Sequence, residues 1–104
     1  MILYNVTVSI DESAEKEWLN WMRSKHIPDV INTGCFTEAR LSRIHAEEHG
    51  GLAYAISYVA INQEKFDEYQ SNHAPALQRE HTERYRGRFA AFRTMMTIVE
   101  EFKP

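Results

Sequence analysis

The alternation of apolar and polar residues along the chain predicts four β-strands. The first covers residues 2–10, where every second residue is apolar. Two amphiphilic segments, 35–46 and 52–61, are predicted to form a hairpin, because the polar, glycine-bearing segment 47–51 between them is typical of a turn. Residues 88–102 are predicted to be a long closing strand.

A tryptophan-rich stretch predicts the first helix. Trp18 and Trp21 belong to an apolar stripe with helical spacing. Pro28 disfavours helical geometry at the preceding residue and leaves a carbonyl without its donor, so we expect the helix to break or kink near His26. A second short turn is then expected to end at Gly34.

A second helical region is predicted over residues 62–86. Its apolar and aromatic residues recur at three or four positions and form one stripe, which contains Phe66, Tyr69, His73, Leu77, His81 and Tyr85. Pro75 indicates a break near the middle of this region.

The resulting order, βαββαβ, is that of the α+β ferredoxin-like fold, in which two helices cover one face of a four-stranded antiparallel sheet. We expect a single domain over residues 1–104. The other face of the sheet needs a cover, because Leu3, Tyr54, Ile56, Tyr58 and residues of the last strand are too apolar to face water. A second copy of the chain could supply it, so two sheets packed face to face would form a homodimeric α/β barrel with a cavity.

The composition limits the partners that such a domain can have. Hydrophobic residues make up 43% and charged residues 26%, as in ordinary globular proteins. The net charge of −3 favours neither nucleic acid nor an anionic membrane surface, and no apolar stretch approaches a membrane span. The single cysteine cannot form an internal disulfide, so we expect a cytoplasmic protein.

Five segments together resemble the pattern of a family of small bacterial proteins known as a domain of unknown function. They are Tyr4–Val8, Trp18–Met22, His26–Val30, His73–Leu77 and Phe89–Thr94. The resemblance covers nearly the whole chain and implies a ferredoxin-like fold similar to the dimeric α/β-barrel superfamily. That superfamily includes cofactor-independent monooxygenases of antibiotic biosynthesis, muconolactone-type isomerases and stress-responsive barrel proteins. A small-molecule cavity is therefore implied, but no particular chemistry.

His26 is the first candidate catalytic residue. Its imidazole can exchange a proton near neutral pH, and Pro28 could fix the chain around it. Asp29 could orient or charge the ring, although the three residues of separation across a break need not bring the two together. The alternative is structural, since a histidine at the end of a helix can cap the unpaired carbonyls there.

Arg93 is the second candidate catalytic residue. It lies in an otherwise apolar strand, where a buried guanidinium needs an anion or several acceptors. It could hold a carboxylate or an enolate with bidentate geometry. The alternatives are an internal ion pair, for instance with Glu38, or a pair across a dimer.

Further candidates for ligand binding are Tyr4, Trp21, Asp29, Arg40, Tyr54 and Tyr58. The tyrosines combine an apolar ring with a polar hydroxyl, although they could equally pack at a dimer interface. Tryptophans at helical spacing more often belong to a core.

We expect no metal and no cofactor. His73 and His81 are eight residues apart, whereas a metal pair would be nearer one helical turn and would need a third ligand. A helix-capping His73 and a hydrogen-bonded, partly buried His81 are the structural interpretations. Cys35 has no histidine nearby in the sequence and is expected to be a buried structural thiol.

The sequence thus predicts a homodimer with a small-molecule cavity bordered by the first helix and the sheet. If it is an enzyme, we expect cofactor-independent acid/base catalysis, monooxygenase- or isomerase-like, on a small organic substrate. His26 would move the proton and Arg93 would stabilise the developing negative charge. The alternative is a noncatalytic dimer that binds a ligand or a protein and uses both residues structurally.

Overall fold

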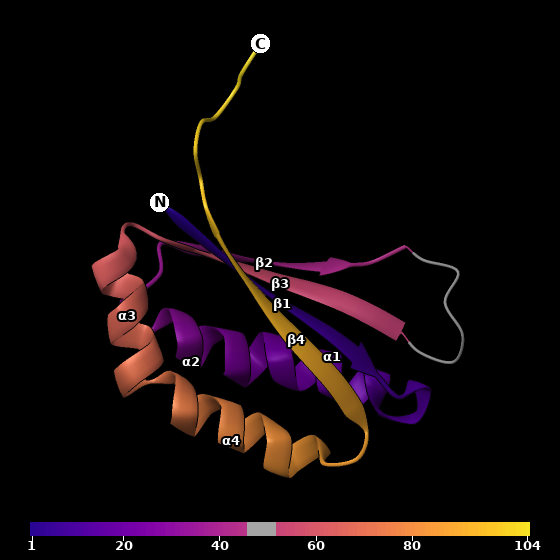
Figure 1. The fold of residues 1–104 in the computed structure, drawn as a ribbon. Coiled ribbons are helices and arrows are strands. Elements are labelled where there is room, and N and C mark those ends of the chain that lie inside the picture. Colours follow the sequence, from indigo (N-terminus) through magenta and orange to yellow (C-terminus); the bar gives the residue numbers. More distant parts are fainter. Residues whose placement is uncertain (46–51) are drawn as a thin grey trace.

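Four antiparallel strands form a sheet in the order β2-β3-β1-β4 (Figure 1). The computed structural model describes residues 1–45 and 52–104. The strands are β1 (Ile2–Ile10), β2 (Glu38–Arg43), β3 (Leu52–Ala60) and β4 (Phe89–Thr97). The predicted ferredoxin-like α+β fold is confirmed, while the turn predicted over residues 47–51 lies outside the described residues. The last strand is shorter than predicted.

The first helical segment passes Pro28 without ending. It consists of a 3₁₀ turn (Glu12–Ala14), α1 (Glu15–Trp21), a π-helical turn (Met22–His26) and α2 (Ile27–Ile31). His26 keeps helical angles, with φ −64° and ψ −53°, so the break predicted there is a widened turn instead. The reason is that Pro28 lies in the first turn of α2, where a missing N–H is tolerated, and the wide turn shifts the hydrogen bonds before it.

The second helical region consists of two helices, and the break predicted from Pro75 is confirmed. α3 (Gln63–Asn72) and α4 (Ala74–Tyr85) meet at His73, and Pro75 lies in the first turn of α4. Asn62 caps α3, because its side-chain oxygen accepts the backbone N–H of Lys65 at 2.9 Å.

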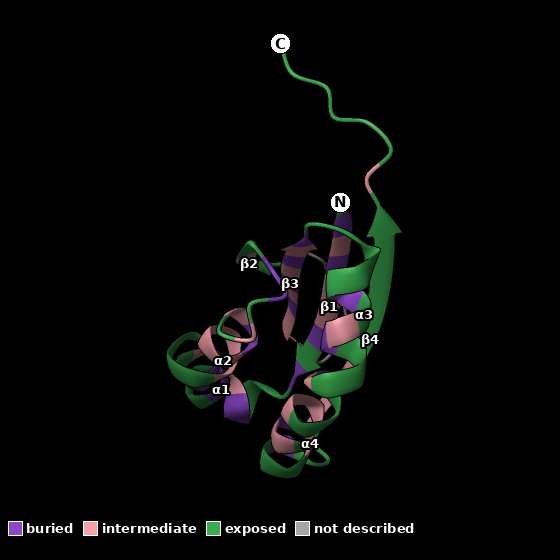
Figure 2. Cartoon of the chain, turned by 90° about the vertical axis from the view of Figure 1, so that its left-hand side faces the viewer, coloured by how far each residue is buried: buried purple, intermediate pink, exposed green. Residues whose placement is uncertain are grey.

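The helices cover one face of the sheet and bury the core between the two layers (Figures 1 and 2). Tyr54, Ile56 and Tyr58 point into this core and are 1–3% exposed. The prediction that they lie on the open face is wrong, because they pair across the sheet with buried residues of β1 such as Tyr4, which is opposite Tyr58.

The open face carries a different apolar set. Leu3 on β1 lies between Val59 on β3 and Met96 on β4, and Phe92 on β4 is opposite Thr7. Figure 2 shows β4 as the most exposed strand of the sheet. Within residues 1–45 and 52–104, no helix has the length and apolar character needed to cross a membrane.

Candidate functional site

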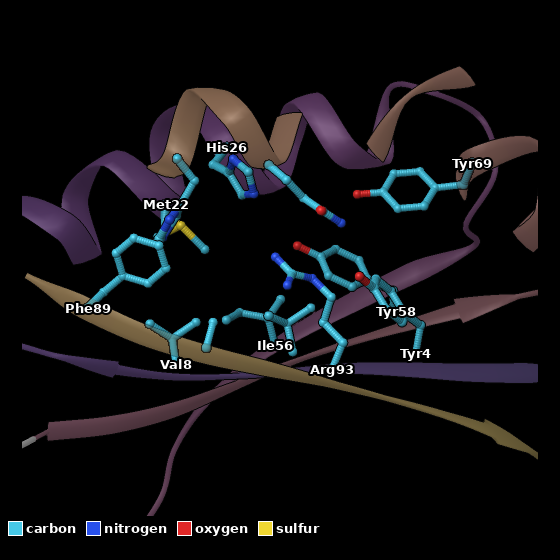
Figure 3. A pocket seen from close by; sticks show the side chains of 13 residues that line it. Tyr4, Val8, Met22, His26, Ile56, Tyr58, Tyr69, Phe89 and Arg93 are labelled. Carbon is cyan, nitrogen blue, oxygen red and sulfur yellow. The ribbon is translucent and has the colours of Figure 1, made fainter. Parts of the chain in front are cut away.

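A small cavity lies between the sheet and the helices (Figure 3). Its volume is about 30 Å³, which is room for about one or two water molecules. The apolar part of its wall consists of Val6, Val8, Met22, Ile56, Phe89 and Ala91. The polar part consists of Tyr4, His26, Tyr58, Tyr69, Gln78, His81 and Arg93. Polar groups from both layers therefore converge on a narrow apolar space.

His26 enters the cavity wall from the π-helical turn. Its Nδ1 atom is buried and has no hydrogen-bond partner within the described residues. The ring packs against Trp21 and His81, with ring centroids 5.1 and 5.6 Å away. Burial lowers the pKa of His26, and the charges of Glu80 and Asp29 only partly oppose this. The imidazole is therefore neutral near pH 7 and able to accept a proton.

Asp29, the carboxylate near His26 in the sequence, does not orient the imidazole. Asp29 binds Lys25 instead, with Oδ2 and Nζ 2.6 Å apart, and the same lysine lies 3.4 Å from Glu80. The interpretation of His26 as a cap at a helix C-terminus is wrong, because the helix continues through it into α2.

His81 stands beside His26 but is fixed by a partner of its own. The indole N–H of Trp18 donates a hydrogen bond of 2.9 Å to its Nε2 atom, so the buried, hydrogen-bonded histidine expected at this position is present. Burial lowers the pKa of His81 to about 4, with the charges of His26 and Arg93 acting in the same direction. His81 is thus a neutral, oriented part of the cavity wall.

Arg93 reaches the cavity from β4, an edge strand, where it lies opposite Val6. Figure 3 shows its side chain extending from the sheet toward the helices, beside Tyr4 and Tyr58. None of the ion pairs within the described part of the chain includes Arg93. The internal pair with Glu38 is wrong, because Glu38 lies on β2 at the opposite edge of the sheet.

Three tyrosine hydroxyl groups share this wall. The ring of Tyr4 lies 6.0 Å from the rings of both Tyr58 and Tyr69. Burial raises the pKa of Tyr4, although Arg93 and Gln78 oppose the rise. Burial likewise raises the pKa of Tyr58 and of Tyr69. The hydroxyls therefore stay protonated and can donate hydrogen bonds to an anion.

Half of the predicted site residues meet in this cavity, namely Tyr4, His26, Tyr58 and Arg93. The others lie elsewhere. Trp21 is buried against His26 without lining the cavity, and Arg40 is exposed on β2. Asp29 is held by Lys25, and the hydroxyl of Tyr54 is bound to Glu15 and Arg43.

Sequence reasoning missed Tyr69, Gln78 and His81 as cavity residues. Tyr69 and His81 belong to the apolar stripe of the second helical region, so the sequence predicts that both face the core. It does not show that they line the same cavity. Gln78 lies outside that stripe, and no pattern in the sequence marks it.

Solved structures with this fold share little sequence with the chain. A dimeric ferredoxin-like protein from an uncultured marine organism has a TM-score of 0.72 at 12% identity, with 100% of both chains covered. A putative antibiotic biosynthesis monooxygenase from Bacillus cereus has a TM-score of 0.69 at 8% identity, covering 99% of this chain and 97% of the other. SnoaB, a cofactor-independent oxygenase from Streptomyces nogalater, has a TM-score of 0.65 at 10% identity, covering 99% and 98%. These similarities show the fold.

Sequence comparison shows the family. Among curated proteins, none matches this sequence. The sequence pattern of the family described as "Domain of unknown function (DUF4286)" matches residues 1–99. Because that match spans nearly the whole chain, the protein belongs to the DUF4286 family.

Proposed function

We propose that this protein binds a small organic acid or enolisable compound in the cavity and acts on it by cofactor-independent acid/base catalysis. The proposal rests on His26, whose buried Nδ1 atom has no hydrogen-bond partner within the described residues. The ring of His26 lines the same cavity as Arg93. A buried polar atom left without a partner costs about 1–3 kcal/mol. A donor group on a ligand would remove that cost.

The proposed reaction begins with a proton transfer. Neutral His26 takes a proton from an acidic C–H or O–H group of the substrate, so that an imidazolium and an enolate or phenolate form. Arg93 and the hydroxyl of Tyr4 stabilise the oxygen of that anion. An isomerase returns the proton to another carbon, whereas a cofactor-independent oxygenase lets the anion react with dioxygen. The similarity in fold to an oxygenase of that kind supports this class of reaction.

The cavity has to open before an organic molecule can enter, because about 30 Å³ holds only water. Arg93 is the side chain best able to move. It belongs to an edge strand, it is exposed, and no described carboxylate forms an ion pair with it. Rotation of the guanidinium outward would open the cavity beside β4, and its return would place a positive charge over the acidic group of the ligand.

The small volume also supports a second candidate function, a noncatalytic dimer in which His26 and Arg93 are structural. In that case the cavity stays closed, and a partner would bind elsewhere on the surface.

We infer further that the protein is a homodimer formed through the open face of the sheet. Phe92 is 64% exposed and Met96 is 41% exposed, beside the less exposed Leu3. The pair of Asn5 and Thr94 separates Phe92 from Leu3 and Met96 on this face, and exposed apolar side chains on both sides of that pair are typical of an interface. A dimeric ferredoxin-like protein of similar structure supports the arrangement. The single thiol, Cys35, is consistent with the reducing cytoplasm as its location.

A thermal-shift screen of small carboxylic acids, phenols and enolisable ketones tests the binding site. A ligand of the cavity should raise the melting temperature of the wild type, and His26→Ala and Arg93→Ala should each reduce that shift. Arg40→Ala is the matched control, because Arg40 is an exposed strand arginine that does not line the cavity. If no ligand shift depends on His26 or Arg93, the proposed site is wrong.

Deuterium exchange separates catalysis from binding. A ligand found in the screen is incubated with the protein in D₂O, and NMR follows the loss of its acidic C–H signal. Catalysis predicts exchange with the wild type and none above background with His26→Ala. Binding without exchange in the wild type supports the noncatalytic function.

A further inference from the structure

Away from the cavity wall, three potential metal ligands from separate segments come together. Cys35 lies in the connection before β2, Glu68 lies on α3, and His73 lies at the junction of α3 and α4. One ligand atom of each lies within 4.8 Å of the other two. Their sequence spacing matches no short metal-binding motif, so the fold itself creates the cluster.

A hydrogen bond already connects Cys35 and Glu68. The thiol donates to Oε2 of Glu68 across 3.3 Å. Loss of this proton would leave a thiolate beside the Glu68 carboxylate. A divalent cation can take its place, because the thiolate is the form of cysteine that binds metal.

His73 supplies the third ligand from a defined position. Its ring stacks on Tyr69, with ring centroids 6.5 Å apart and an interplanar angle of 27°. It also borders a shallow, open hollow together with Asn32 and Thr33. Water can therefore reach His73 from this hollow.

We propose that Cys35, Glu68 and His73 bind a zinc ion, with water as the fourth ligand. Zinc accepts sulfur, nitrogen and oxygen ligands together in tetrahedral geometry, whereas calcium and magnesium prefer oxygen ligands alone. The side chain of Glu68 is 41% exposed and His73 is partly buried, so both side chains can rotate to close the site around the ion. The bound zinc would join the connection before β2 to α3 and to the start of α4. This inference does not depend on the proposed catalytic activity.

Lys65 competes with the metal. Its Nζ atom lies 3.6 Å from Oε1 of Glu68 in an exposed ion pair. Such an exposed pair is weak, so Lys65→Ala should raise zinc affinity by at most about fivefold. A purely structural role for the cluster would give no such increase.

Cobalt titration of the full chain, in reducing buffer without chelator, tests the site directly. We expect one Co²⁺ per chain and the charge-transfer absorption of a cobalt–thiolate bond. Cys35→Ser should abolish that absorption, and His73→Ala or Glu68→Gln should lower zinc affinity by at least about tenfold. His45→Ala is the control, because His45 is exposed and lies outside the cluster.

Two results would overturn the proposal. One is the absence of thiolate absorption in the wild type at equimolar cobalt. The other is zinc affinity that stays at the wild-type value in both His73→Ala and Glu68→Gln. Circular dichroism of each variant verifies its fold. If Cys35→Ser does not fold, the variants of the exposed Glu68 side chain and the partly buried His73 still test the site.

Discussion

The indole N–H of Trp18 donates a hydrogen bond of 2.9 Å to Nε2 of His81 inside the core. Trp18 is fully buried and His81 is 7% exposed, so the bond connects α1 to α4 away from water. Because Nε2 is the acceptor, the neutral ring carries its proton on Nδ1. This bond fixes the tautomer and the orientation of a ring that lines the cavity beside His26.

Trp18→Phe should therefore destabilise the protein, because it leaves Nε2 of His81 buried without a hydrogen-bond donor. We expect the free energy of unfolding to fall by about 1–3 kcal/mol beyond the loss of packing, measured by urea denaturation. Trp21→Phe is the control, because Trp21 is also buried but its indole makes no hydrogen bond in the described structure. Equal losses in the two variants would contradict the role of the bond.

Acid should destabilise the protein through His81. Its pKa is about 4 in the folded state and about 6.5 when exposed, so between these values the unfolded chain binds more protons. The contribution of His81 to the free energy of unfolding is fully present above pH 6.5 and is lost as the pH falls from 6.5 toward 4. The loss is at most about 3 kcal/mol. The lowered pKa of His26 acts in the same direction.

Urea denaturation at several pH values between 4.5 and 7.5 measures this dependence. His81→Phe should flatten the rise of stability with pH, even if it lowers stability overall. An unchanged pH dependence in that variant would show that other groups, such as the carboxylates, cause the acid sensitivity.

The sequence predicts the strands and helices well because burial on one side imposes a period of two or of about 3.6 residues. It does not show which face of the sheet the helices cover. The alternation places Tyr54, Ile56 and Tyr58 on one face, as observed, but only the pairing of β3 with β1 shows that this face is the inner one. Pro28 likewise signals a disturbance of the helix without revealing that a π turn absorbs it.

The candidate site is less predictable because its parts are far apart in the sequence. His26 and Arg93 line one cavity only because β4 pairs with β1 under the helices. Cys35, Glu68 and His73 come together through the junction of α3 and α4, which no local spacing encodes. Residue chemistry therefore indicates candidates, and the topology decides which of them meet.

Gly34 should be needed for its backbone conformation alone. Its φ angle is +80°, and a Cβ atom added there meets nothing within 4 Å. Gly34→Ala should cost about 1–2 kcal/mol from the left-handed conformation. Gly34→Asn should cost less, since asparagine adopts this region more readily. Thermal or urea denaturation measures the difference, and an alanine variant as stable as the wild type would contradict the argument.

Phe92→Asp should convert the proposed dimer into a monomer. Phe92 is 64% exposed on the open face, and a carboxylate there would be buried without a partner in a dimer formed through this face. Sedimentation velocity at micromolar concentration should show a dimer for the wild type and a monomer for the variant.

Ile61→Asp is the matched control for that experiment. Ile61 is 58% exposed, an apolar residue similar in exposure to Phe92, but it lies after the end of β3 and outside the sheet. If the open face forms the interface, Ile61→Asp remains dimeric while Phe92→Asp dissociates, because the charge enters the buried surface in one variant alone. A wild type that sediments as a monomer would exclude the dimer, and dissociation of both variants would place the interface nearer the end of β3.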